Sequence, residues 1–180
     1  MIVRLVQFLS SFLLVLVVGS LWGTWFALSR SIDALSPQTF LEVGHAMIGN
    51  FAPVMPILMP AALLVTLLAG ILLLRVSRAA AYLTLAGFLL FTAVTLVTVL
   101  GNVPIDLQIA AWTPATLPPD WAETRDRWEL LHTLRTFLSL AGIACVLVGD
   151  LLPPRGPPVG SPIASQARSA SEMTPDAEGG

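Results

Sequence analysis

Four long apolar stretches constrain this chain more than any other feature. They cover residues 2–28, 51–74, 79–100 and 130–152, and each is at or above the roughly 20 residues that a helix needs to cross the hydrocarbon core of a bilayer. Hydrophobic residues make up 56% of the chain and charged residues only 11%, which is too apolar for an ordinary soluble domain. The sequence therefore predicts an all-α integral membrane protein, with residues 1–152 forming a four-helix bundle.

The connecting segments carry helix signals of their own. Residues 2–28 are longer than the apolar core of a signal peptide, so we expect this first span to be retained. Ser36 followed by Pro37 is typical of a helix start and predicts a short helix outside the membrane, between spans one and two. Asp120, with Glu123 three residues later, is typical of a helix cap. Residues 102–129, between spans three and four, are expected to form a polar loop that leads into the last helix.

The arginines predict an orientation. If the four spans alternate in direction, one side of the membrane receives five of them: Arg4, Arg75, Arg78, Arg155 and Arg168. The positive-inside rule then places both termini in the cytoplasm and both polar loops on the outer face. All the basic residues are Arg, and Ala and Pro are abundant, which indicates a GC-rich bacterial gene and hence the bacterial inner membrane. Residues 153–180, rich in Pro, Ser and Gly, are expected to form a disordered cytoplasmic tail.

The last helix carries a stripe of polar and aromatic side chains. Six residues fall within roughly 80° of one another at helical spacing: Trp121, Arg125, Trp128, His132, Arg135 and Ser139. Apolar sequence surrounds His132 and Arg135, and ionisable groups at such depth usually face the bundle interior or a wet cavity. For Arg135, a structural ion pair with Asp106 or Glu42 is the alternative to a functional role. For His132 the alternative is a hydrogen-bonded core residue.

Other features permit further interpretations. The five tryptophans gather near one predicted membrane interface, where such rings commonly act as anchors, although Trp121 and Trp128 are also placed to wall an aromatic pocket. His45 and His132 with Glu42 or Asp106 match the ligand types of some iron sites, and paired histidines can bind haem. Their spacing is not that of a metal motif, so we expect no metal or other cofactor, with haem or iron as the alternative. A net charge of -2 without a basic run predicts no nucleic-acid binding.

The segment between residues 102 and 136 carries a family resemblance. It contains Asn102-Val103-Pro104-Ile105-Asp106, Trp112, Asp120-Trp121, Arg125, Arg127-Trp128, His132 and Arg135-Thr136. With these residues the chain resembles, over residues 13–150, the anthrone oxygenase-like family of small four-helix membrane proteins. The family pattern has Asn at the position of Asp106. The better-known fungal members oxidise an anthrone to an anthraquinone with molecular oxygen and no evident cofactor, so the resemblance implies a possible oxidoreductase of a flat phenolic aromatic.

Such chemistry assigns candidate roles to the stripe. His132 is the candidate general base, and Arg125 or Arg135 is the candidate stabiliser of the oxyanion. The candidate substrate-binding residues are Trp121, Trp128, Trp112, Asn102, Asp106, His45 and Glu42. Two other function classes stay open: a non-catalytic membrane scaffold or partner subunit, and a binder of a lipid-soluble molecule such as a quinone. Membrane lipid is the expected surrounding, and the sequence specifies no oligomeric state.

Overall fold

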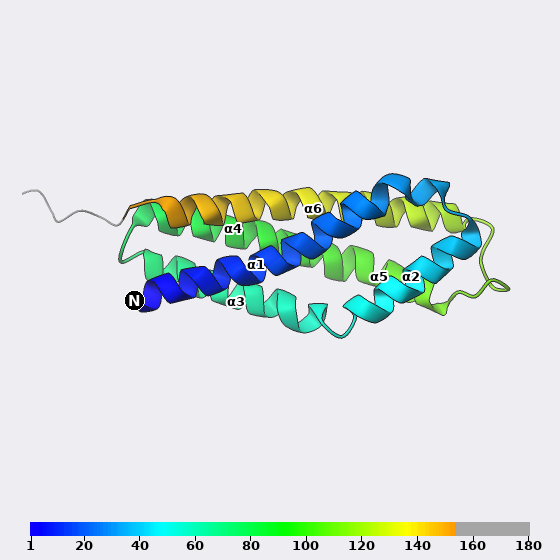
Figure 1. The fold of residues 1–180 in the computed structure, drawn as a ribbon, viewed down its shortest axis with the longest axis horizontal. Coiled ribbons are helices and arrows are strands. Elements are labelled where there is room, and N and C mark those ends of the chain that lie inside the picture. Colours follow the sequence, from blue (N-terminus) through cyan, green and yellow to red (C-terminus); the bar gives the residue numbers. More distant parts are fainter. Residues whose placement is uncertain (154–180) are drawn as a thin grey trace, which may run out of the picture.

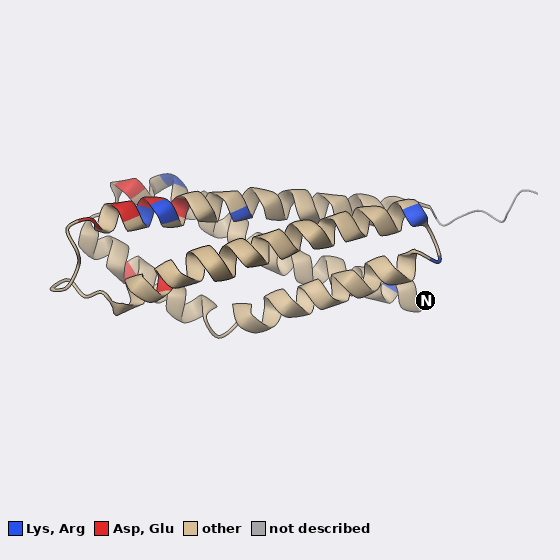
Figure 2. Ribbon diagram, turned by 180° about the vertical axis from the view of Figure 1, so that it is seen from behind, with Lys and Arg blue, Asp and Glu red and all other residues tan. Residues whose placement is uncertain are grey.

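The computed structural model describes residues 1–153, which form a bundle of helices with no strand in that part of the chain (Figure 1). Its four candidate spans are α1 (Ile2–Ala27), α3 (Met55–Leu73), α4 (Arg78–Val97) and α6 (Trp121–Leu151). Charged residues gather mainly towards the ends of the bundle, and long stretches of the helices between them carry none (Figure 2). The predicted all-α bundle is confirmed, and its four long apolar helices make the chain a multi-pass membrane protein.

The four long helices form a closed ring in which each has two neighbours. Helix α1 packs on α3 and α6, and α4 packs on the same two helices. The first and last helices also meet through hydrogen bonds, because Gln7 Nε2 and Ser11 Oγ each donate to the Asp150 carboxylate at 2.7 Å. Both ends of the described chain therefore lie at one end of the bundle (Figure 1).

Glycines allow α4 and α6 to approach closely. A Cβ atom on Gly87 would lie only 2.8 Å from the backbone oxygen of Gly142, and one on Gly142 would lie 2.9 Å from the ring of Phe91. Membrane helices commonly use such small residues to bring their backbones together. Beside this contact, the fully buried side chains of Phe91, Val94 and Val146 form part of the main apolar core.

The opposite end of the bundle is built from short helices. The predicted short helix is present as α2 (Pro37–Phe51), and the Ser36 hydroxyl accepts a hydrogen bond from the Thr39 N–H at 3.2 Å. It follows a 3-10 helix, η1 (Ser29–Ala34). Because α2 continues to Phe51, the second span begins at Met55 rather than at residue 51.

The segment expected to be a polar loop is partly helical. Helix α4 continues through a π-helix, η2 (Thr98–Asn102), directly into α5 (Val103–Ala111). Pro104 does not interrupt the helix. It lies in the first turn of α5, where the backbone N–H that proline lacks is not needed. Helix α6 begins at Trp121 with Asp120 at the N-cap position, as predicted, but the Asp120 side chain makes no capping hydrogen bond. The prediction for the tail falls on residues 154–180, outside the described residues.

Candidate functional site

A cavity of about 500 Å³ lies inside the half of the bundle that contains α2 and α5. This volume is within the usual range of small-molecule sites, about 300–1,000 Å³. Its lining comes from α1, α2, α3, the end of α4, η2, α5 and α6, and most of it is aliphatic, aromatic or methionine side chain. Among the described residues, three ionisable side chains line it: Asp106, His132 and Arg135.

Trp128 joins the acidic residue to the imidazole. Its indole Nε1 donates a hydrogen bond of 2.8 Å to Asp106 Oδ1, which ties α6 to α5. The same indole stacks on His132 with 4.9 Å between ring centroids and 12° between ring planes. The stacked pair gives the cavity a flat aromatic wall. The other carboxylate oxygen, Oδ2 of Asp106, receives no hydrogen bond from the described residues.

Arg135 holds the imidazole of His132 in one tautomer. Its Nε and Nη2 atoms lie 3.1 and 2.9 Å from His132 Nδ1, and its Nη1 donates to Thr98 Oγ1 at 3.3 Å. A guanidinium can only donate hydrogen bonds, so Nδ1 is the acceptor and the ring proton of the neutral imidazole is on Nε2.

That Nε2–H group has no acceptor within hydrogen-bond geometry among the described residues. His132 is only 1% exposed, and although the backbone of Leu21 lies beside the ring, no described acceptor meets hydrogen-bond geometry with Nε2. A buried donor without an acceptor is costly, about 1–3 kcal/mol. Because the imidazole lines the cavity, an acceptor atom of a bound molecule that approached Nε2 would satisfy this donor.

The ion pair considered for Arg135 is not formed. Among the described residues, the one ion pair joins Arg125 and Asp126, at 2.7 Å. Glu42 instead accepts a hydrogen bond from Gln38 at 3.1 Å, and Asp106 is bonded to Trp128. The guanidinium of Arg135 thus borders the cavity without a contacting carboxylate, and a bound oxygen atom with negative charge would satisfy it.

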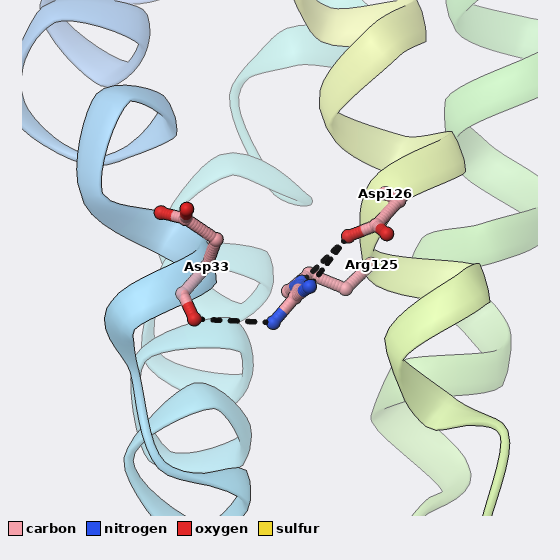
Figure 3. Close-up of polar contacts among 3 residues, drawn as sticks. All are labelled: Asp33, Arg125 and Asp126. Atoms are coloured by element: carbon pink, nitrogen blue, oxygen red, sulfur yellow. Dashed lines mark hydrogen bonds and ion pairs between the residues drawn. The ribbon is translucent and has the colours of Figure 1, made fainter.

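Arg125 and Trp121 lie outside the cavity lining, although both belong to the predicted stripe. Arg125 pairs with Asp126 and donates to the backbone oxygen of Asp33 at 3.4 Å (Figure 3). Its guanidinium also lies over the Trp121 ring, 5.2 Å from the centroid, and that ring packs against Phe40. These contacts fasten the start of α6 to η1 and α2, so they close the short-helix end of the bundle.

Three further predicted residues do not line the cavity. Asn102 is fully buried, its Nδ2 donates to the backbone oxygen of Trp128 at 3.3 Å, and its Oδ1 has no partner among the described residues. His45 donates from Nε2 to the backbone oxygen of Ile109 at 2.9 Å. Trp112 packs against the apolar cluster that contains Ile32 and Phe40.

The two histidines do not meet in one site. No three His, Cys, Asp or Glu side chains within residues 1–153 are grouped so that they could hold a metal ion. The ligand set of His45 and His132 with Glu42 or Asp106 is therefore not assembled.

Sequence reasoning missed the apolar side of the cavity. Part of this lining comes from α2, where Phe40, Val43, Met47 and Phe51 recur at helical spacing. That amphipathic pattern could have revealed a second wall of the site. The contributions of Met55 and Met59 from α3 and of Thr24 from α1 carry no such local signal, because a membrane helix is apolar on all sides.

One of the comparisons with known proteins finds a match. The family model described as Anthrone oxygenase matches residues 51–145, a range that contains Asp106, Trp128, His132 and Arg135. No curated protein and no solved structure matches the chain.

Proposed function

The chain belongs to the anthrone oxygenase family, and on this premise we propose that it oxidises a flat phenolic aromatic of the anthrone type with molecular oxygen inside the cavity. The observation that carries the proposal is the set of polar groups in an otherwise apolar space. One carboxylate, Asp106, shares the lining with the N–H groups of His132 and Arg135 and with the aromatic wall of Trp128. A planar ring system needs such a wall, and a reaction that generates an oxyanion needs such donors.

The proposed reaction converts one CH₂ group to a carbonyl. A base removes a proton from the methylene carbon, which leaves an anion whose charge is delocalised onto the ketone oxygen. This anion gives electrons to O₂ and forms a C–O bond, and protonation produces a hydroperoxide. Loss of the second C–H proton with cleavage of the O–O bond then releases water and leaves the new carbonyl.

We assign proton removal to Asp106, which stands where the family pattern has Asn, so this base would be particular to this chain and not shared by the family. A general base needs a free lone pair within reach of the proton, and Asp106 Oδ2 receives no hydrogen bond from the described residues. Because Arg135 donates to Nδ1 of His132, the neutral imidazole has no free lone pair. The role first expected for His132 therefore changes in this proposal from base to donor.

Arg135 and His132 are proposed to stabilise the oxyanion. The Nε2–H of His132 has no acceptor among the described residues, and Arg135 has no contacting acid. Preorganised donors in a site that excludes water can accelerate reactions strongly, with about 10²–10³ in kcat for a single donor. Trp128 holds the Asp106 carboxylate in place by donating a hydrogen bond from its indole N–H.

Oxygen consumption by the purified protein in detergent, with anthrone as substrate, tests the proposal. We expect wild-type protein to consume oxygen above the spontaneous rate, and Asp106→Asn to lose about a hundredfold or more of this activity. The Asn side chain keeps an oxygen that can accept from Trp128, so the variant removes the base without removing this contact. His45→Gln, outside the cavity lining, is the matched control.

The outcomes separate the candidate functions. Wild-type protein that leaves the spontaneous rate unchanged would remove the oxygenase proposal, and full activity in Asp106→Asn would remove Asp106 as the base. Tight binding of a quinone without oxygen consumption would favour the carrier, which would use the same two donors. An absorption spectrum with metal analysis of the same sample checks the proposal that no haem or metal takes part.

A further inference from the structure

The cavity has two exposed borders, and each follows one side of a helical segment. Among the residues that line the cavity, the exposed ones are confined to Ala52, Pro56 and Pro60 on one border and Val99, Val103 and Leu107 on the other. Pro56 and Pro60 are four residues apart in α3 and share a face, and Ala52 lies just before them at the end of α2. Val99, Val103 and Leu107 are spaced by four residues along the continuous helical path of η2 and α5. We call these two borders the α3 lip and the α5 lip.

Both lips are apolar throughout. Val99 is 54% exposed, Val103 39% and Leu107 67%, although all three also border the cavity. An aqueous opening for a polar ligand would carry polar side chains, and neither lip contains a polar side chain. Proline in the α3 lip and the π-helix η2 in the α5 lip also interrupt the regular α-helical backbone along these two borders of the cavity.

The lips lie near one face of the membrane. Val99 is 21 residues beyond the start of α4 at Arg78, which corresponds to about 32 Å along a helix. This distance is close to the hydrocarbon thickness of a bilayer, about 30 Å. The opening therefore faces the boundary between acyl chains and headgroups, on the side away from the Arg75–Arg78 turn.

Access along the bundle axis is covered. The buried side chains of Ile32, Phe40, Ile105 and Ile109 cluster with Trp128 at this end, and the contacts of Arg125 with Asp33 and Trp121 hold the covering elements together. The exposed border of the cavity is therefore on its side, between the α3 lip and the α5 lip.

We propose that an uncharged planar aromatic dissolved in the lipid passes laterally between the α3 lip and the α5 lip into the cavity. This inference rests on the proposed function, since it concerns access to the same site. It adds that the substrate is taken from the bilayer and that Val99, Val103 and Pro56 control its rate of passage.

The test compares lip variants with variants of the adjacent lipid-facing surface. Anthraquinone is the probe, phosphatidylcholine nanodiscs carry the full-length protein, and quenching of tryptophan fluorescence gives association and dissociation rates. The double variant Val99→Phe/Val103→Phe narrows the α5 lip. Its control, Leu96→Phe/Leu100→Phe, changes two exposed residues that do not line the cavity.

We expect the lip variant to slow association and dissociation by about tenfold or more while Kd changes much less, because a narrowed passage affects both directions equally. The control should keep the wild-type rates. Pro56→Phe on the α3 lip, with Ile57→Phe as its control, gives an independent measurement if the double variant does not fold.

Unchanged rates in the lip variants, or equal slowing in the controls, would overturn the route. Absence of anthraquinone binding by wild-type protein would overturn the route, whereas the proposed function is decided separately by oxygen consumption from anthrone. Binding with slowed kinetics in the lip variants, but without oxygen consumption from anthrone, would support the route and remove only the oxidation.

Discussion

At the scale of single residues, the pairing of Arg135 with His132 is the feature with the clearest chemical consequence. Two guanidinium nitrogens converge on Nδ1, so one side chain determines which atom of the other carries the proton. The arginine has hydrogen-bonding capacity left, since a guanidinium has five N–H groups. We expect a ligand carbonyl to accept from it.

Arg135→Ala should therefore weaken the binding of anthraquinone. A hydrogen bond to a charged group contributes about 1.5–3 kcal/mol, so we expect Kd to rise by roughly tenfold or more. Equilibrium fluorescence quenching measures this change. Arg127→Ala is the control, because Arg127 is exposed on the same helix; equal affinities for both variants would contradict a direct role of Arg135.

At the scale of helices, the contact between α4 and α6 supports one wall of the site. It depends on close backbone approach at Gly87, where an added Cβ would lie 2.5 Å from Val146 Cγ2 as well as 2.8 Å from the Gly142 oxygen. A backbone oxygen cannot move aside as the end of a flexible side chain can. The two helices must separate to accept a larger residue.

Gly87→Ala should lower the free energy of unfolding by about 1–3 kcal/mol, the usual cost of overpacking. Gly23→Ala is the matched control, because nothing lies within 4 Å of its added Cβ and alanine favours helix by up to about 1 kcal/mol. Denaturant unfolding in detergent compares the two. A smaller loss of stability for Gly87→Ala than for Gly23→Ala would show that the α4 and α6 contact does not limit stability.

At the scale of the whole molecule, both ends of the described chain lie together, as the contacts of Asp150 with Gln7 and Ser11 show. The orientation of this bundle in the membrane stays a prediction from the arginines. Arg4, Arg75 and Arg78 belong to the end of the bundle where both ends of the described chain lie, which the positive-inside rule assigns to the cytoplasm. The cavity would then open towards the outer leaflet.

Cysteine labelling in intact bacteria checks this orientation. In a Cys145→Ala background, we expect an impermeant thiol reagent to label Thr113→Cys, between α5 and α6, but not Leu74→Cys, between α3 and α4. Both cysteines should react after the cells are opened. Labelling of Leu74→Cys alone in intact cells would reverse the orientation.

The sequence by itself determined the class of fold and the helix that carries much of the chemistry. A long apolar run is enough to predict a membrane span, because the ability of a helix to cross the bilayer depends on its own length and composition. The stripe on α6 followed from helical periodicity, which is also local. Trp128, His132 and Arg135 were identified together for this reason, and the same segment carried the family resemblance.

Only the tertiary structure decided which part of that stripe borders the cavity and which side chains form hydrogen bonds with one another. Trp121 and Arg125 share the periodicity of His132 but lie outside the cavity lining, because η1 and α2 cover the start of α6. Periodicity alone also could not tell that Arg135 bonds to His132 while Asp106 bonds to Trp128. Partner choice depends on where α5 leaves α4 and on how closely the helices approach, and these distances arise only when the elements pack.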